Sequence, residues 1–177
     1  MTAGDEAVAS PFWRFSLAIY ADPEVAKSCI ELQDGTGVDV NVLLFVLWAA
    51  SRGRCLSVDE VREIVAAVET WRESVVVPLR TARRSLRSPP ASIDAKRAAA
   101  LRLQVKKVEL EAEQLQQEAL YRWRTVEQLG RPEPLLDAAA TANIKSYAAV
   151  LEKEFGAAAI DILLAALRRQ QTRGTSQ

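Results

Sequence analysis

The sequence predicts an all-α protein, a bundle of about seven helices in which one buried apolar helix is central and one long charged helix either projects as an arm or folds into a hairpin. Residues 42–50 form a run of nine apolar residues, and a helix that is apolar all round belongs in the middle of a bundle. Residues 93–129 contain neither proline nor glycine and are rich in strong helix formers. No segment has the alternating pattern and turn residues of a strand.

Two short helices are predicted before the apolar segment. A serine and a proline at positions 10–11 form a helix start, and the helical pattern continues to Tyr20. An aspartate and a proline at positions 22–23 repeat this signal and predict a second helix that ends near Gln33. Residues 1–10 contain neither a basic segment nor an apolar run and are expected to be disordered.

The central helix is predicted to start after Asp39, whose carboxylate is suited to cap it, and to end at Gly53. Asp34 lies in the glycine-containing turn before it. The two aspartates either end one helix and cap the next, which is the simpler interpretation, or provide polar contacts to a ligand. Asn41 lies in the first turn of the apolar helix, where its buried amide requires partners on a neighbouring helix or on a ligand.

A capping box at Ser57 and Glu60 predicts the next helix, and Pro78 is expected to kink or break it. After the proline, arginines recur at i, i+3, i+4 and i+7, so that one helical face carries four guanidinium groups. These are Arg80, Arg83, Arg84 and Arg87. Such a face either binds carboxylates, phosphates or RNA, or forms ion pairs with the acidic N-terminal third of the chain or with Glu109, Glu111 and Glu113.

The distribution of charge favours pairing within the chain. Residues 1–70 carry 11 acidic and 5 basic side chains, residues 71–107 carry 2 and 10, and residues 108–177 carry 10 and 8. The net charge is therefore zero, although the middle of the chain is strongly basic. A basic segment between acidic ones usually pairs internally, but it can also hold an anionic partner.

Prolines in the short segment before the long helix form the clearest linker, so a boundary is expected there. A glycine and two prolines in residues 130–134 are expected to stop the long helix, and two further helices are predicted over residues 135–155 and 158–168. The predicted parts are a disordered N-terminus over residues 1–10, a helical domain over 11–88, a linker over 89–92, the long helix with C-terminal helices packing back over 93–169, and a disordered tail over 170–177.

Several classes of function are disfavoured. The chain has no histidine, which removes His-dependent catalysis and His-containing zinc sites, and it has no glycine-rich phosphate loop. No catalytic residue, cofactor or metal site is predicted, and an enzyme is the less favoured class. Only two cysteines are present, and neither a leader peptide nor an apolar run long enough to cross a bilayer is recognisable. A cytoplasmic protein without a membrane span is therefore expected.

Three stretches carry a family resemblance: FWRFSLAIY, CIELQDGTGVDVNVLLFVLWA and WRESVVVPLRTARRSLR. In this order they resemble a family of small proteobacterial proteins of unassigned function, over residues 11–86. The resemblance implies a bacterial cytoplasmic helical domain and implies no reaction. The residues at its motif positions are Asp34, Asp39, Asn41, Trp71, Arg72, Pro78 and Arg80.

The favoured functional interpretation is a noncatalytic interaction or regulatory module of the bacterial cytoplasm. In this interpretation the long helix binds a protein partner or a second copy of the chain, as in a homodimer. Tyr121 and Trp123 lie on that helix and are candidate contact residues.

The first alternative is an enzyme or carrier for an anionic amphiphile. Asp34, Asp39 and Asn41 would provide its polar contacts, and the anion would be held by one or more of Arg72, Arg80, Arg83 and Arg84. This alternative requires the arginines to converge on the aspartates around an apolar cavity. The second alternative, RNA or ribosome binding through the arginine face, is disfavoured because no aromatic residues are interleaved with the arginines.

Overall fold

The structure is a computed structural model that describes residues 9–174. These residues form eight α-helices, a π-helical turn, a 3-10 turn and two very short strands, which confirms the all-α class. Counting α4, η1 and α5 as one bent helix gives the predicted seven. The elements are α1 (Pro11–Tyr20), α2 (Pro23–Thr36), α3 (Val40–Ser51), β1 (Arg54–Cys55), α4 (Val58–Trp71), η1 (Arg72–Val76), α5 (Val77–Ser85), α6 (Ala95–Trp123), η2 (Val126–Gln128), β2 (Arg131–Pro132), α7 (Leu136–Val150) and α8 (Ala157–Gly174).

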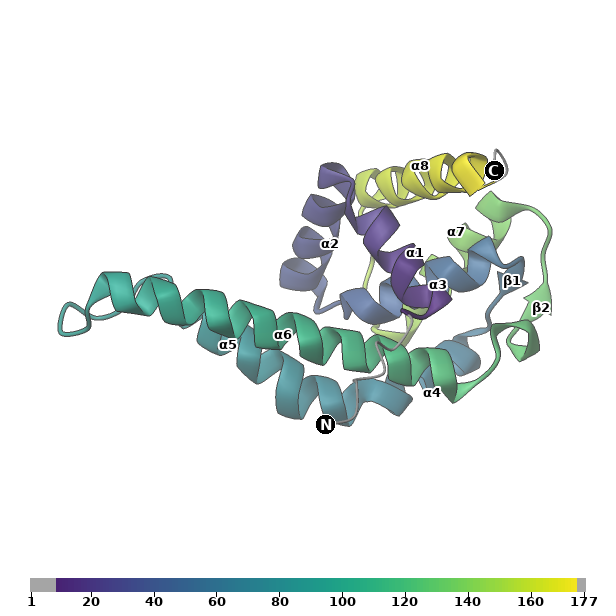
Figure 1. The fold of residues 1–177 in the computed structure, drawn as a ribbon. Coiled ribbons are helices and arrows are strands. Elements are labelled where there is room, and N and C mark those ends of the chain that lie inside the picture. Colours follow the sequence, from purple (N-terminus) through teal and green to yellow (C-terminus); the bar gives the residue numbers. More distant parts are fainter. Residues whose placement is uncertain (1–8, 175–177) are drawn as a thin grey trace, which may run out of the picture.

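Helix α3 is the centre of the bundle, as its composition predicts. Residues 41–50 are all buried, and α1, α2, α4, α6, α7 and α8 all pack against α3 (Figure 1). The hydrophobic core is continuous across the predicted linker, because it includes Phe12 and Phe45 from before the linker as well as Leu120 and Leu163 from after it. The linker therefore does not separate two cores.

The predicted helix starts are confirmed at four positions. The side chains of Ser10, Asp22 and Asp39 accept hydrogen bonds from backbone amides in the first turns of α1, α2 and α3. Ser57 and Glu60 form the complete capping box of α4. Helix α2 continues three residues beyond the expected end at Gln33 and stops where Gly37 adopts a left-handed conformation, with φ of 77°.

Pro78 neither breaks nor sharply separates the helices around it. The π-helical turn η1 lies immediately before it, and α5 continues from Val77 without an intervening loop. Proline cannot donate the amide hydrogen bond that an α-helix requires at this position. The wider π-helical turn is a known way for a helix to absorb such a defect.

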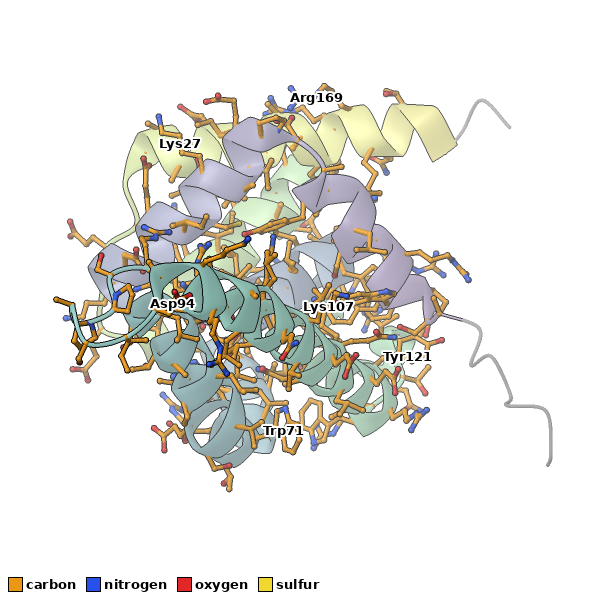
Figure 2. The ribbon with its side chains drawn as sticks, turned by 60° about the vertical axis from the view of Figure 1, so that its left-hand side comes forward. Lys27, Trp71, Asp94, Lys107, Tyr121 and Arg169 are labelled. Atoms are coloured by element: carbon orange, nitrogen blue, oxygen red, sulfur yellow. The ribbon has the colours of Figure 1, made fainter. Side chains whose placement is uncertain are left out.

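Helices α5 and α6 pack side by side as a hairpin whose tip extends beyond the rest of the molecule (Figure 1). Residues 89–92 lie in the turn at this tip, so the predicted linker is the hairpin connection. The N-cap of α6 is Asp94, whereas the sequence pattern suggested an earlier start. Figure 2 looks towards the tip, with Asp94 at the near end of α6 and Tyr121 towards the far end.

The predicted extension of the long helix to residue 129 is wrong. Helix α6 ends at Trp123, and Arg124 is extended. The 3-10 turn η2 follows and places Val126 and Leu129 in the core. Local helix propensity alone would predict that the helix continues straight. Burial of these two apolar side chains favours the bend instead.

One short strand pair joins the segment after α3 to the segment after α6 within residues 9–174. Strands β1 and β2 pair antiparallel, with Arg54 opposite Pro132 and Cys55 opposite Arg131. This pair was not predicted from the sequence, because strands of two residues are too short to show an alternating pattern. Gly130 lies against the backbone of Cys55 with a positive φ of 55°.

Helix α8 is longer than expected, because it continues to Gly174 and so includes residues 170–174 of the predicted tail. The disorder expected for residues 1–8 and 175–177 concerns positions outside the described residues. Within residues 9–174 no helix combines the length and the apolar character that crossing a bilayer requires.

Candidate functional site

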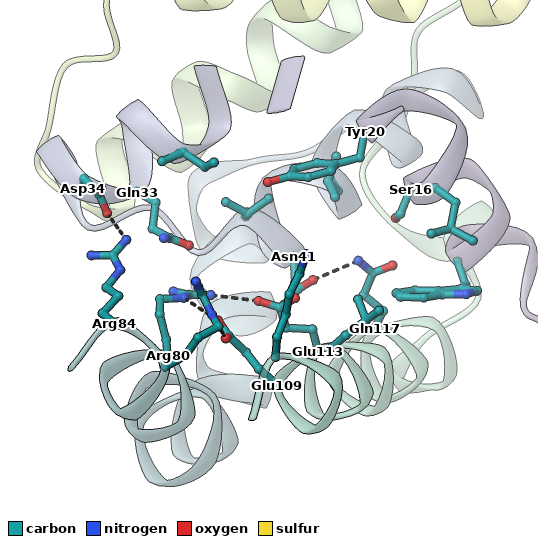
Figure 3. Close-up of a pocket in the computed structure, with 18 of the residues that line it drawn as sticks. Ser16, Tyr20, Gln33, Asp34, Asn41, Arg80, Arg84, Glu109, Glu113 and Gln117 are labelled. Carbon is teal, nitrogen blue, oxygen red and sulfur yellow. Dashed lines mark hydrogen bonds and ion pairs between the residues drawn. The ribbon is translucent and has the colours of Figure 1, made fainter. Parts of the chain in front are cut away.

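A cavity of about 700 Å³ lies between the helix pair α1–α2 and the hairpin α5–α6, with the first turns of α3 between them (Figure 3). Its apolar lining comes from all these elements except α5. The apolar lining residues are Trp13, Leu17, Tyr20, Ile30, Val40, Leu44 and Leu110. Leu17, Ile30 and Leu110 are about half exposed, so an apolar rim surrounds the opening of the cavity to solvent.

The arginine face of α5 forms one wall of this cavity. Arg80 donates to Glu109 at 3.3 Å and to Glu113 at 2.9 Å, and Arg83 binds the same Glu109 carboxylate through Nε and, at 3.1 Å, through Nη2. Glu109 is 5% exposed. Burial of these carboxylates is compensated by two guanidinium groups, which is the condition under which buried charges are tolerated.

The burial of this cluster changes its proton affinities. Burial raises the pKa of Glu113, and the charge of Arg80 opposes that rise. The hydrogen bonds with Glu109 raise the pKa of Arg83. Burial also raises the pKa of the neighbouring Tyr20 phenol to about 12, so this hydroxyl stays protonated at neutral pH.

The outer part of the arginine face is less completely paired. Arg84 binds Asp34 at 2.6 Å across the opening, from α5 to α2, and this hydrogen bond lowers the pKa of Asp34. Arg87 and Lys106 also line the cavity and are exposed. In the part of the chain that the structure describes, neither has an acidic side chain within ion-pair distance, so both are available to a ligand.

Asn41 has protein partners on α6. Its Nδ2 donates to Gln116 at 3.1 Å, and its Oδ1 accepts from Gln117 at 2.8 Å. Gln116 in turn donates to the Asp39 carboxylate at 2.5 Å. The same Asp39 oxygen, Oδ2, lies 3.5 Å from Nε of Arg72. The expected structural explanation for Asn41 is therefore present, and Asn41 also lines the cavity.

The structure brings most of the predicted residues together. Asp34, Asn41, Arg80, Arg83, Arg84 and Arg87 all line the cavity. Asp39 and Arg72 are not part of the lining, since Asp39 caps α3 and Arg72 binds both its carboxylate and the carbonyl oxygen of Gly37.

Tyr121 and Trp123 lie elsewhere, on the end of α6 that packs against the body of the molecule. The Tyr121 ring packs on Trp48 with 5.7 Å between ring centroids, and the Arg124 guanidinium stacks over the Trp123 ring at 4.3 Å. Both aromatic side chains are half-buried.

Several lining residues were not predicted. Ser16 on α1 and Gln117 and Lys106 on α6 are polar residues with no distinctive spacing in the sequence. The sequence held one signal for Ser16: it is a polar residue on the inner side of a helix, among the apolar residues Phe12, Phe15 and Ile19. No cluster of three or more acidic or cysteine side chains suited to a metal ion occurs in residues 9–174.

The model of a family described as "Protein of unknown function (DUF2390)" matches residues 11–120 of the chain. No curated protein and no solved structure matches it. The matched segment runs from the start of α1 to near the end of α6, and every residue that lines the cavity lies within it. The match confirms the resemblance to a family without an assigned function.

Proposed function

Because the chain belongs to the DUF2390 family, whose description assigns no activity, we propose its function from the cavity: it binds an anionic amphiphile, a small molecule with an apolar body and one anionic group. The observation that carries this proposal is a surplus of positive charge. Five cationic side chains line the cavity against three carboxylates. Two of the cations, Arg87 and Lys106, have no acidic partner in the described segment, so an anion at the opening would provide one.

The remaining lining supports an apolar body for the ligand. Leu17, Ile30 and Leu110 surround the opening, and Val40 and Leu44 lie further in. A volume of about 700 Å³ is within the range of small-molecule sites, which are mostly apolar with a few polar groups that fix the orientation of the ligand. Exposed apolar side chains around such an opening favour a ligand that covers them.

The proposal can be tested by isothermal titration calorimetry with hexanoate, octanoate and decanoate, and with octanol as an uncharged ligand. The wild-type protein is expected to bind at least one of the acids, and octanol more weakly than octanoate. In Lys106→Glu a positive charge near the opening becomes negative. At about 6 Å in water this reversal weakens an anion's binding by about 1.4 kcal/mol, or about tenfold.

The matched control is Lys107→Glu. Lys107 is the next residue of α6, is exposed and does not line the cavity, so its reversal changes the net charge equally but acts from further away. Equal effects of the two reversals, or no binding of any of the acids by the wild-type protein, would overturn the proposal.

Self-association through α6 is a second candidate, and it is favoured by a separate surface. Leu101, Val108 and Leu115 follow each other at intervals of seven residues on α6, and each is about half exposed. Trp71 lies beside them, since its indole donates to the carbonyl oxygen of Ala112 at 3.0 Å and it remains 37% exposed. Figure 2 shows Trp71 at the lower edge of the molecule, below α6.

The proposed occupant of this surface is a second copy of α6 in antiparallel orientation. Pairing about a two-fold axis at Val108 would place Leu101 against Leu115, and Arg97 near Glu118 of the other copy, so both the apolar and the charged positions are self-complementary. Sedimentation velocity tests this arrangement. Val108→Glu is expected to yield monomers, and Leu103→Glu, on the opposite flank of the helix, is not. A wild-type protein that sediments as a monomer at all concentrations would exclude it.

A further inference from the structure

The inner end of the cavity holds two buried polar atoms that have no hydrogen-bond partner in residues 9–174. They are Oγ of Ser16 on α1 and Oε1 of Gln117 on α6, and each residue is 3% exposed. Both residues line the cavity. Figure 3 places them together on the side away from the Arg84–Asp34 pair, on opposite walls. An unpaired polar atom is costly in such a buried position, so each requires an explanation.

The orientation of the Gln117 amide follows from a chain of hydrogen bonds that starts at a carboxylate. The Asp39 carboxylate, which also pairs with Arg72, can only accept, so Gln116 must present its NH₂ group to it. The oxygen of Gln116 then accepts from Asn41, and the oxygen of Asn41 accepts from the NH₂ group of Gln117.

Every amide in this chain is therefore directed the same way, and the last acceptor, Gln117 Oε1, is left for the cavity. A flip of the Gln117 amide would place its oxygen against the Asn41 oxygen. A flip of all three amides would place the Gln116 oxygen against the Asp39 carboxylate. The chain consequently fixes an acceptor, and not a donor, at the inner end of the cavity.

We propose that this inner end is a subsite for a hydroxyl group at the far end of the ligand's apolar body. The inference rests on the proposed function and specifies its ligand: an amphiphile with an anion at one end and a hydroxyl at the other. A hydroxyl can donate to Gln117 Oε1 and accept from the Ser16 hydroxyl at the same time, which satisfies both atoms. The exposed cations at the opening hold the anionic end.

Other polar groups fit the inner end less well. A second carboxylate cannot donate, and it would face the Gln117 oxygen. An ammonium group would be buried without a free counter-charge, because the nearby Glu113 and Glu109 are already bound by Arg80 and Arg83. A methyl end would leave both protein atoms unpaired.

The test compares hexanoate, octanoate and decanoate with the ω-hydroxy acids of equal length by isothermal titration calorimetry. For at least one chain length, the wild-type protein is expected to bind the ω-hydroxy acid about tenfold more tightly than the plain acid, because only the former satisfies the buried acceptor. Ser16→Ala should reduce this preference. It removes a hydroxyl that has no partner in the described residues, so no hydrogen bond within the protein is lost and folding is not compromised.

Ser28→Ala is the matched control, since Ser28 is equally buried on α2 but does not line the cavity, and it should retain the full preference. If plain acids bind as tightly as the ω-hydroxy acids, the subsite is overturned and the anion-binding proposal stays intact. Water would then satisfy Ser16 Oγ and Gln117 Oε1. A Ser16→Ala protein with an unchanged preference would also overturn it. If no acid of either series binds, the proposed function fails and the subsite with it.

Discussion

Glu109 is predicted to oppose ligand binding while it stabilises the fold, and Glu109→Gln separates the two effects. Glu109 is 5% exposed, and its carboxylate is shared by Arg80 and Arg83. The arginine side chains are 14% and 21% exposed, so they cannot be fully rehydrated when the charge is removed. Glutamine retains the shape and one oxygen acceptor of glutamate but removes the counter-charge.

The expected loss of stability can be bounded from these contacts. Removing one partner of a buried ion pair typically costs about 3–5 kcal/mol. Arg80 keeps its bond to Glu113 at 2.9 Å, and the glutamine oxygen can still accept from Arg83, so the lower end, about 3 kcal/mol, is expected. For a protein of this size that corresponds to a decrease in Tm of about 6–12 °C.

Urea unfolding followed by tryptophan fluorescence and circular dichroism measures this loss. Glu111→Gln is the control, because it removes the same charge from the same helix at an exposed position. The control is expected to change the free energy of unfolding by no more than about 0.5 kcal/mol. Similar losses in the two variants would refute the reasoning that the buried pairing stabilises the hairpin.

The same variant should bind octanoate more tightly than the wild-type protein. Loss of one lining carboxylate increases the surplus of positive charge in the cavity, and an anion in the cavity then provides the missing counter-charge. Stability and affinity are therefore expected to change in opposite directions. Weaker octanoate binding by a folded Glu109→Gln protein would contradict the assigned role of the charge.

Three further substitutions test other parts of the fold by urea unfolding. Asn41→Leu leaves the Gln117 amide without its acceptor and should lower the free energy of unfolding by about 2–4 kcal/mol. A decrease below about 0.5 kcal/mol would show that the chain of amide hydrogen bonds is not needed for packing. Gly130→Ala should cost about 3 kcal/mol or more, because a Cβ there would lie 2.8 Å from the carbonyl carbon of Cys55 at a φ of 55°, and an unchanged midpoint would be inconsistent with that approach. Burial raises the pKa of Cys29 to about 12, so as the pH rises above about 8.5 the thiol loses its proton in the unfolded chain before it does so in the folded protein. The free energy of unfolding should therefore decrease as the pH rises above about 8.5. In Cys29→Ala this decrease should be shallower.

Local features of the fold could be predicted from the sequence. The caps at Ser10, Asp22 and Asp39 and the capping box at Ser57 depend on side chains within a few residues of the amides that they satisfy. The burial of α3 follows from its composition alone. These interactions are short in sequence, so no knowledge of the tertiary structure is needed to recognise them.

Features that depend on distant partners could not be predicted in the same way. The end of α6 at Trp123 is set by the burial of Val126 and Leu129 in a core to which α3, α7 and α8 contribute. The π-helical turn before Pro78 lies where α4 and α5 both pack on α6. Helix propensity continues past Trp123, where tertiary packing decides against it, whereas at η1 the following Pro78 itself removes an amide donor.

The candidate site was partly predictable for a geometric reason. A spacing of i, i+3 and i+4 places Arg80, Arg83 and Arg84 on one face of α5, whereas Arg87 lies in the turn after Ser85, the last residue of that helix. The sequence offered Glu109, Glu111, Glu113 and the acidic N-terminal third as partners but could not select among them, because Glu109 and Glu113 come from another helix and Asp34 from a third. The sequence left internal pairing and anion binding as alternatives, and the structure combines pairing of the inner arginines with two outer cations free of acidic partners among residues 9–174.

Asn41 shows why these alternatives need not exclude each other. Its two hydrogen bonds to α6 satisfy a buried amide and fix how α3 packs against that helix, which is the structural explanation for a polar residue in an apolar helix. The Asp39 carboxylate fixes the orientation of the Gln116 amide, and the same two hydrogen bonds of Asn41 then fix the orientation of the Gln117 amide. If Asn41 were replaced by an apolar residue, Gln117 could rotate, and the cavity would lose the fixed acceptor at its inner end. A residue that stabilises the packing can thus also determine which chemical group the cavity accepts, and the preference for ω-hydroxy acids is expected to disappear in Asn41→Leu even if the protein remains folded.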